Sequence, residues 1–190
     1  MDRPLHIFDF DDTLVFSGAV VHVTHADGSI EALESHEFAT YVEQPGDEFN
    51  FSEFDTYPPA GRIINKSFNA LKKAIADYGV ANVVVLSARG KSEPMRQFLE
   101  DSGLTDNIEI VGVASANPID KANFVKNRIK GGDYGTVVIH EDSMANIKAI
   151  GNMISDSFPD IEYVSHHVQA ESLLRKTIHN LLKEITFCRK

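Results

Sequence analysis

Three carboxylates follow directly on an apolar run near the start of the chain. The run LHIF leads into DFDDT, so that Asp9, Asp11 and Asp12 occupy three of four consecutive positions. If this run is a strand that stays regular, its period of two places Asp9 and Asp11 on the same side. Two adjacent carboxylates cannot both ionise cheaply, so their pKa values should separate. Such a pair suits chemistry in which one carboxylate, kept anionic by a divalent cation, acts as a nucleophile while the other carries a proton.

Polar residues also follow later apolar runs. The second run ends in SARG, which begins at Ser87, and the fourth ends in EDS, which begins at Glu141 and has Asn146 one helical turn further on. The third run leads through SANP to Lys121, near the start of a helical segment. In an open parallel sheet, ligands bind beyond the carboxyl ends of the strands. We therefore expect the acids, the hydroxyl and the lysine to gather around one point.

The elements that must position these residues alternate along the chain. Short β-branched runs predict strands at residues 5–10, 82–87, 108–113, 136–140 and 161–165. Helical periodicity lies between them, at 61–78, 93–101, 120–130 and 144–158, and a further amphipathic stripe covers 173–185. This alternation is typical of βαβ units. We predict an α/β fold: a three-layer, Rossmann-like arrangement of a mainly parallel sheet with helices on both faces.

Residues 18–59 interrupt this alternation. The segments 19–24 and 29–33 flank Ala26-Asp27-Gly28, and Asp-Gly is a strong hairpin signal. Beyond them, the stretch EQPGDEFNFSEFDTYPPAG is acidic, aromatic and broken by prolines. We predict a hairpin followed by an irregular loop, too short for a separately folded cap. The predicted organisation is one domain over 1–190, with its core in 1–17 and 60–190 and the insertion in 18–59.

Composition narrows the class of protein. The formal charge of −10 argues against broad adhesion to nucleic acid or anionic membrane, although it leaves a local basic groove open. Cys188 is the only cysteine, so no internal disulfide can form, which fits a reducing compartment. No apolar run approaches the roughly 18 residues that a membrane helix needs. We expect a soluble, cytoplasmic protein without a membrane partner.

The motifs resemble those of one known family. DFDDT fits the aspartate-x-aspartate-x-threonine signature of the haloacid-dehalogenase-like (HAD) hydrolases. Ser87 then matches the family's strand-end serine or threonine, Lys121 its lysine, and Glu141-Asp142 its last acidic motif, so the resemblance covers roughly residues 5–165. It implies that Asp9 is a nucleophile that forms an aspartyl-phosphate. It also implies that Asp11 is the general acid and base, with its backbone carbonyl on a metal ion.

The resemblance further implies a metal and a phosphate site. Mg²⁺ suits an oxygen-only set of ligands, and the implied ligands are Asp9, Asp11 and Asp142. Glu141 is the second choice, because the family commonly shows two aspartates, or glycine and aspartate, at this point. Substrate-binding residues would be Ser87, Ala88, Arg89 and Lys121, with Lys126 as a fallback for Lys121. Arg89 either reaches the substrate phosphate or pairs with a surface acid.

Several nearby residues also have structural interpretations. We expect Asp12 to face solvent or to cap, and Thr13 to bond the loop backbone. The aromatic residues of the insertion are expected to pack the loop onto the core, although they could instead stack a base or sugar: Phe49, Phe51, Phe54 and Tyr57. The histidines lack the ligand spacing of a zinc site, which favours exposed positions for them.

Together these features lead us to expect a Mg²⁺-dependent phosphohydrolase that cleaves a phosphomonoester through Asp9. A small insertion would leave the site open, so a nucleic-acid end phosphatase or a nucleotidase, acting with a partner repair enzyme, is one alternative. The substrate could thus be a small molecule, a nucleotide or a nucleic-acid end. A binding protein that has kept the fold and lost turnover is an alternative of another class, supported only by the glutamate at position 141.

Overall fold

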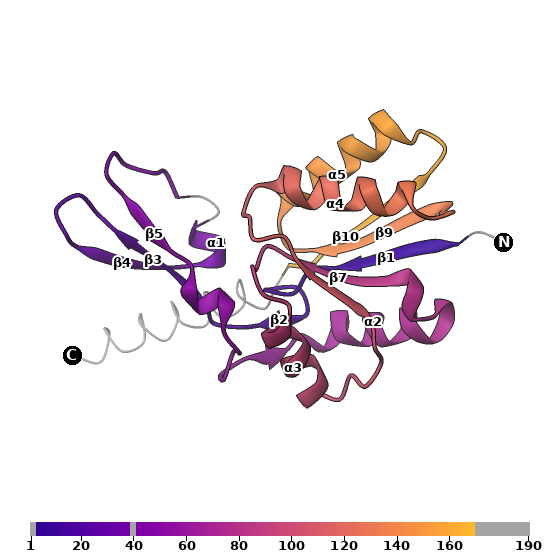
Figure 1. Ribbon diagram of the computed structural model, residues 1–190, viewed down its shortest axis with the longest axis horizontal. Coiled ribbons are helices and arrows are strands. Elements are labelled where there is room, and N and C mark those ends of the chain that lie inside the picture. Colours follow the sequence, from indigo (N-terminus) through magenta and orange to yellow (C-terminus); the bar gives the residue numbers. More distant parts are fainter. Residues whose placement is uncertain (1–2, 39–40, 170–190) are drawn as a thin grey trace, which may run out of the picture.

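The protein is built around a five-stranded parallel sheet (Figure 1). The computed structural model describes residues 3–38 and 41–169. Across the sheet the strand order is β10-β9-β1-β7-β8. The bounds of these strands, in chain order, are Pro4–Phe8 for β1, Val83–Ser87 for β7, Glu109–Gly112 for β8, Thr136–Glu141 for β9 and Glu162–His167 for β10. The predicted strands therefore form, each within about two residues of its expected ends.

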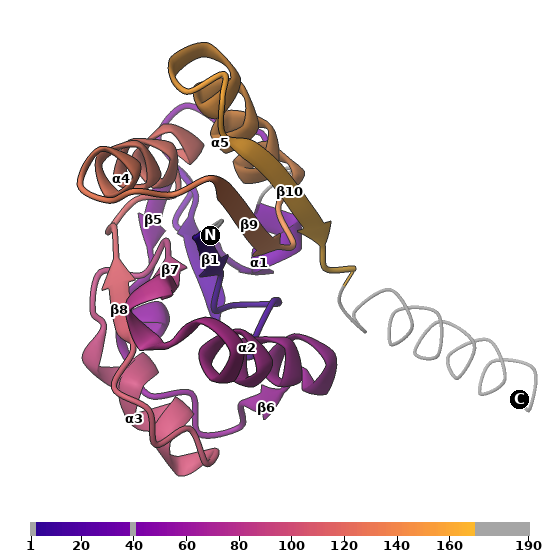
Figure 2. The same cartoon turned by 90° about the vertical axis from the view of Figure 1, so that its right-hand side faces the viewer.

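Helices cover both faces of this sheet, as Figure 2 shows with the sheet seen nearly end-on. On one face lie α2 (Asn65–Tyr78) and α3 (Glu93–Asp101); on the other lie α4 (Pro118–Lys130) and α5 (Met144–Ser157). The predicted three-layer, Rossmann-like α/β fold is confirmed. The predicted amphipathic segment 173–185, and Cys188, lie outside the described residues.

Alternation along the central strands divides the core into two layers. Phe8 of β1 and Val83 and Val85 of β7 point toward α2 and α3 and belong to one buried cluster. Ile7 of β1 and its neighbour Val84 belong to the cluster on the α4 and α5 side. Because a parallel strand buried on both faces must be apolar throughout, these runs read as continuous hydrophobic segments. The central strands are thus held rigidly on both sides.

The insertion leaves and rejoins the core through a short antiparallel ribbon. Strands β2 (Val15–Phe16) and β6 (Arg62–Ile63) form this ribbon. Because β6 occupies the start of the predicted first helix, α2 begins only at Asn65. Figure 1 shows the insertion beyond the carboxyl end of β1, on the side away from the N-terminus.

Within the insertion, the prediction of a hairpin followed by an irregular loop was incomplete. The hairpin forms from β3 (Val20–Thr24) and β4 (Ile30–Glu34), with Gly28 at a positive φ of 83° in its turn. A third strand, β5 (Glu48–Asn50), pairs with β3 on its other side. Short helices follow β4 and β5, namely α1 (Ser35–Phe38) and the 3₁₀ helix η1 (Ser52–Asp55).

This three-stranded sheet has a small core of its own. Val21, Val23 and Leu33 are buried, and the partly buried rings of Phe38 and Phe49 pack against them. The strand β5 escaped prediction because it is only three residues long and has no β-branched residue.

Within the described ranges, no helix combines the length and apolar character that a membrane-spanning segment needs.

Candidate active site

The strand ends of the sheet meet the insertion at a pocket of about 970 Å³. Strands β1, β7 and β9 are parallel neighbours, so their carboxyl ends reach the same edge of the sheet. The pocket is lined from these ends by Asp9, Ser87 and Glu141, and from the first turn of α4 by Lys121. The residues that the sequence placed at strand ends are therefore brought together here.

Lys121 connects two of the acids. Its Nζ lies 2.6 Å from Oδ1 of Asp9 and 2.9 Å from Oε2 of Glu141. Only 3% of Lys121, 5% of Asp9 and 1% of Glu141 is exposed. Because these groups are shielded from water, their charges must be compensated by one another. Burial alone would lower the pKa of Lys121, but the charges of Asp9 and Glu141 outweigh it and raise that pKa. The lysine is accordingly cationic at neutral pH.

Asp9, Glu141 and Asp142 form a compact acidic group. Each offers a carboxylate oxygen, and these atoms all lie within 4.8 Å of one another. Burial, followed by the charge of Glu141, raises the pKa of Asp9 to about 8. Burial, followed by the charge of Asp9, raises the pKa of Asp142 to about 9. Lys121 contacts two of the three acids, so ionisation of all three would leave an excess of negative charge.

A divalent cation fits this arrangement. All three side chains offer oxygen, the ligand type that Mg²⁺ prefers. A cation among them would offset the excess charge and favour the ionised carboxylates. Thr13, which was expected to bond the loop backbone, instead directs its hydroxyl at Oδ1 of Asp142, at a long 3.5 Å. The site residues therefore suit a metal ion that lies between the ends of β1 and β9.

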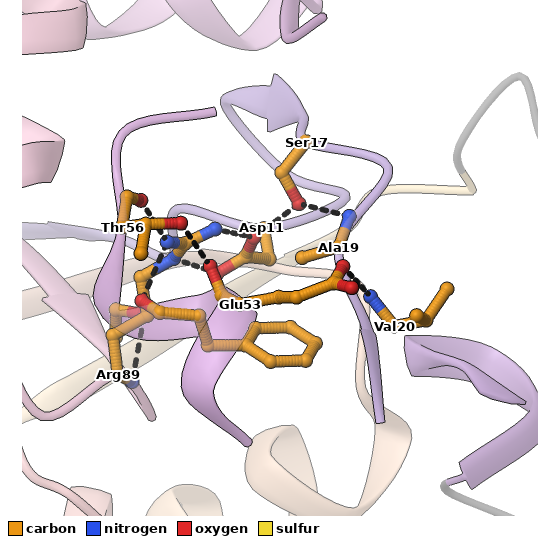
Figure 3. Close-up of polar contacts among 9 residues, drawn as sticks. Asp11, Ser17, Ala19, Val20, Glu53, Thr56 and Arg89 are labelled. Atoms are coloured by element: carbon orange, nitrogen blue, oxygen red, sulfur yellow. Dashed lines mark hydrogen bonds and ion pairs between the residues drawn. The ribbon is translucent and has the colours of Figure 1, made fainter. Parts of the chain in front are cut away.

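The carboxylate of Asp11 lies outside this acidic group. Arg89 donates two hydrogen bonds to it, from Nε to Oδ2 and from Nη2 to Oδ1, both at 2.7 Å. Ser17 donates a third from its hydroxyl at 2.6 Å. Figure 3 shows these contacts around Asp11. Glu141, the second choice of the sequence interpretation, thus lies beside Asp9 and Asp142 in the acidic group.

Arg89 ties this acid to the insertion. Its Nη1 donates to the backbone carbonyl of Phe54 at 2.6 Å and to that of Thr56 at 3.1 Å. The guanidinium also lies over the rings of Phe10 and Phe54, 5.1 and 5.4 Å from their centroids. Of the two sequence interpretations of Arg89, the structure has the pairing with an acid. The pair does not lie on the surface, however, because the acid is Asp11 and Arg89 is only 2% exposed. Almost all of the five N–H donors of the Arg89 guanidinium are therefore engaged in hydrogen bonds.

Backbone packing fixes the loop that carries Arg89. Ser87 ends β7, and its Oγ accepts a hydrogen bond from the Arg89 amide at 3.2 Å. The carbonyl of Arg89 accepts one from the amide of Ala114. A Cβ at Gly112 would lie 2.3 Å from this carbonyl oxygen, so only glycine permits the close approach of β8. Ser87 and Ala88, both predicted to bind substrate, line the pocket.

The remaining residues from the sequence prediction fall into two groups. Asp12 has a positive φ of 56° in the turn after β1, and Lys126, the fallback for Lys121, is not among the residues that line the pocket. Asn146 lines the pocket on α5, where its backbone N–H donates to Ser143 Oγ at the helix N-cap. His22 bonds Glu53, and so contributes to the insertion rather than to the acidic group.

Four aromatic residues of the insertion divide between structure and pocket. Phe49 packs in the insertion's core, and Tyr57 lies against Phe98, with its hydroxyl bonded to Asp101. Phe51 and Phe54 line the pocket. Sequence reasoning missed Phe38, which lines it too, and Ser17, which bonds Asp11. Phe38 reaches the site only through the fold of the insertion, and Ser17, which directly follows β2, reaches Asp11 through the turn between β1 and β2.

Comparisons with known proteins bear on the fold. No protein-family model matches the chain, and no curated protein matches it either. Among solved structures, the chain is similar to the crystal structure of the Legionella pneumophila effector Ceg4, with a TM-score of 0.50 and 11% sequence identity. The likeness covers 88% of this chain and 86% of that chain. At this identity it supports the architecture and carries no information about the chemistry.

Proposed function

We propose that the protein is a Mg²⁺-dependent phosphohydrolase of the HAD-like type, which cleaves a phosphomonoester through an aspartyl-phosphate on Asp9. The observation that carries the proposal is the position of Asp9. Its carboxylate lies at the end of β1, 2.6 Å from the Lys121 ammonium and within 4.8 Å of oxygens of Glu141 and Asp142. A nucleophile, a fixed cation and a set of metal ligands are thus adjacent in one pocket.

In the first step, an oxygen of Asp9 attacks phosphorus, and the bond from phosphorus to the leaving oxygen breaks. Asp11 gives a proton to that leaving oxygen. Lys121 and the hydroxyl of Ser87 offer hydrogen bonds to the phosphoryl oxygens as negative charge develops there. Mg²⁺, held by Asp9 and Asp142 with Glu141 beside them and the backbone carbonyl of Asp11 as a further ligand, would neutralise charge on the phosphoryl group.

In the second step, water attacks phosphorus and releases phosphate, and Asp11 accepts the proton of that water. Asp9 is thereby regenerated as a carboxylate. Both roles of Asp11 require one of its oxygens to face the reacting groups. Arg89 and Ser17 bond Oδ1, whereas the bond that Oδ2 accepts comes from Arg89 Nε, so Oδ2 keeps a second acceptor position that can exchange a proton while Arg89 holds the carboxylate in place.

The central experiment measures phosphate release by the wild type from phenyl phosphate, nucleotides, sugar phosphates and end-phosphorylated oligonucleotides. Each is assayed with Mg²⁺ and with a chelator. Release should require Mg²⁺ and should vanish in Asp9→Asn, because an amide cannot act as the nucleophile. Asp12→Asn is the matched control: it makes the same change nearby, and asparagine tolerates the positive φ of this position.

The alternative of a binding protein without turnover makes the opposite prediction. It is favoured by one observation, the three hydrogen bonds that the carboxylate of Asp11 accepts from Arg89 and Ser17. Under that alternative, wild type and Asp9→Asn would release no phosphate from any substrate, while Mg²⁺ would still raise the melting temperature of the wild type. Asp142→Asn should abolish that rise, because it removes one of the metal ligands.

A further inference from the structure

The insertion contributes an apolar wall to the pocket. Val21 of β3, Phe38 of α1 and Phe51 and Phe54 around η1 all line it. The ring of Phe51 meets that of Phe38 edge to face, with 5.2 Å between the centroids. Even so, 42% of Phe51 remains exposed. A large apolar side chain that faces a pocket and stays this accessible is a surface suited to a ligand.

The charges of the pocket point the same way. Among the described residues that line it, the cations are Arg89 and Lys121, and both are bonded to carboxylates at 2.6 to 2.9 Å. Lys91 lies near the pocket, 3.7 Å from Asp55, and is paired with that residue. The carboxylates that line the pocket are more numerous: Asp9, Asp11, Asp55, Glu141 and Asp142.

This balance limits what the pocket can accept besides one phosphoryl group. A second phosphate, or the backbone of a nucleic acid, gains its affinity from cations that are free to pair with it. The lining cations are engaged with acids of the protein, and the nearby carboxylates repel further negative charge. An uncharged ring, by contrast, can lie against Phe51 without displacing any ion pair.

We propose that the substrate is a small phosphomonoester whose leaving group carries an uncharged planar ring, bound against Phe51 and Phe38, and that it carries no second phosphoryl group. The proposal rests on the proposed function for its reacting end, and on the insertion for its ring. The same wall would serve an aryl ring or a nucleobase, since both present a flat π-surface. The wall thus selects the leaving group, while the strand ends hold the phosphoryl group.

The test compares phenyl phosphate with glycerol 2-phosphate, which lacks a ring. Phe51→Ala should lower kcat/KM for phenyl phosphate about tenfold and leave that for glycerol 2-phosphate within about twofold. Ile30→Ala is the matched control, because Ile30 is also an exposed apolar residue of the insertion and does not line the pocket. Equal loss for both substrates, or no loss for either, would overturn the proposal.

Two further sets of substrates test which kind of ring binds and whether additional phosphates are excluded. Adenosine monophosphate is compared with phenyl phosphate, which tells a nucleobase from an aryl group. Adenosine diphosphate and a 5′-phosphorylated oligonucleotide test the exclusion of further phosphates. Both should have a lower kcat/KM than the monophosphate, and a preference for either would contradict the proposal.

A binding measurement separates failure of this proposal from failure of the proposed function. Titration calorimetry of Asp9→Asn with Mg²⁺ should give a lower Kd for phenyl phosphate than for glycerol 2-phosphate, and adding Phe51→Ala should remove the difference. Ring-selective binding with no turnover in the wild type would refute the phosphohydrolase and retain the ring site. Turnover without ring selectivity would refute the ring site and retain the phosphohydrolase. Binding of neither probe would refute the ring site.

Discussion

The two sides of the pocket are constructed differently. On the core side, Lys121, Glu141 and Arg89 are almost completely buried, and each is paired with an opposite charge. On the insertion side, Phe51 is substantially exposed, and the supporting sheet buries only a small cluster. The charged groups are therefore fixed by a rigid scaffold, whereas the apolar wall sits on a part with little core of its own. Such a division suits reaction on the first side and recognition on the second.

The comparison also separates two kinds of sensitivity to substitution. A change among the buried charges leaves a partner without compensation in a region of low dielectric, so it should cost stability as well as activity. A change at the apolar wall removes contact area that faces solvent or ligand, so it should alter substrate preference and little else.

The largest effect is expected where the core side loses its lysine. Lys121→Met leaves Asp9 and Glu141 buried without their cation, which should lower the free energy of unfolding by about 3 kcal/mol or more. Urea unfolding without Mg²⁺ measures this. Lys126→Met is the control on the same helix, away from the pocket residues, and should change the value little. Equal losses of unfolding free energy in the two variants would mean that the buried contacts of Lys121 contribute no more to stability than those of Lys126.

An intermediate effect is expected at Arg89, where the two sides touch. Arg89→Lys keeps the charge but cannot bond both oxygens of Asp11 and the carbonyls of the insertion together. Misplacement of Asp11 should then lower kcat by about 10- to 100-fold. The pH profile of kcat should also change, which a purely structural loss would not produce.

The control for Arg89 is Arg96→Lys, because Arg96 makes hydrogen bonds to Asn107 and to the carbonyl of Ile108, and does not line the pocket. It should retain the wild-type pH profile. A rise in kcat on Arg89→Lys would reverse the interpretation, since Arg89 would then restrain Asp11 instead of positioning it.

The smallest effect concerns the insertion alone. A hydrogen bond to Asp47, 2.9 Å from Nδ1, raises the pKa of His25 above its ordinary value of 6.5. Hydrogen bonds from Tyr41 and the amide of Gln44 lower the pKa of Asp47 below its ordinary 3.8. The His25 contribution to stability is complete below pH 6.5 and is lost as pH rises through the raised value. The Asp47 contribution is present above pH 3.8 and is lost as pH falls through the lowered value.

The insertion should therefore be held most firmly between about pH 4 and pH 6.5. Amide hydrogen exchange of β3 and β5, corrected for the intrinsic pH dependence of exchange, should show greater opening above this window, and β7 in the same samples should not. His25→Gln should remove the change above the window. A profile for β3 that follows β7 throughout would contradict the role of this histidine.

The sequence was sufficient to predict the framework of the core. Continuous β-branched runs mark strands buried on both faces, and helical periodicity marks the helices that cover them. A boundary was less accurate: the helix was predicted from residue 120, whereas α4 starts at Pro118, after Asn117 accepts a hydrogen bond from the amide of Ile119 as its N-cap. The strand ends then indicate which residues share an edge.

The pairing of charges at that edge could not be predicted in the same way. Arg89 pairs with Asp11, and Lys121 pairs with both Asp9 and Glu141. Both pairings depend on strand order, with β1 between β7 and β9. Strand order is a property of the whole fold. The contacts of Phe38 likewise depend on a third strand in the insertion, which has too few residues to give a pattern.

The ribbon of β2 and β6 has a consequence for how such a protein can diverge. Because Val15 pairs with Ile63 and Phe16 with Arg62, the segment between them departs and returns at one place on the core. Its length or sequence can change without shifting the register of any strand in the parallel sheet, as is usual where inserted segments are tolerated. The ribbon is therefore a point at which one lineage could exchange the insertion while inheriting the same set of residues at the strand ends.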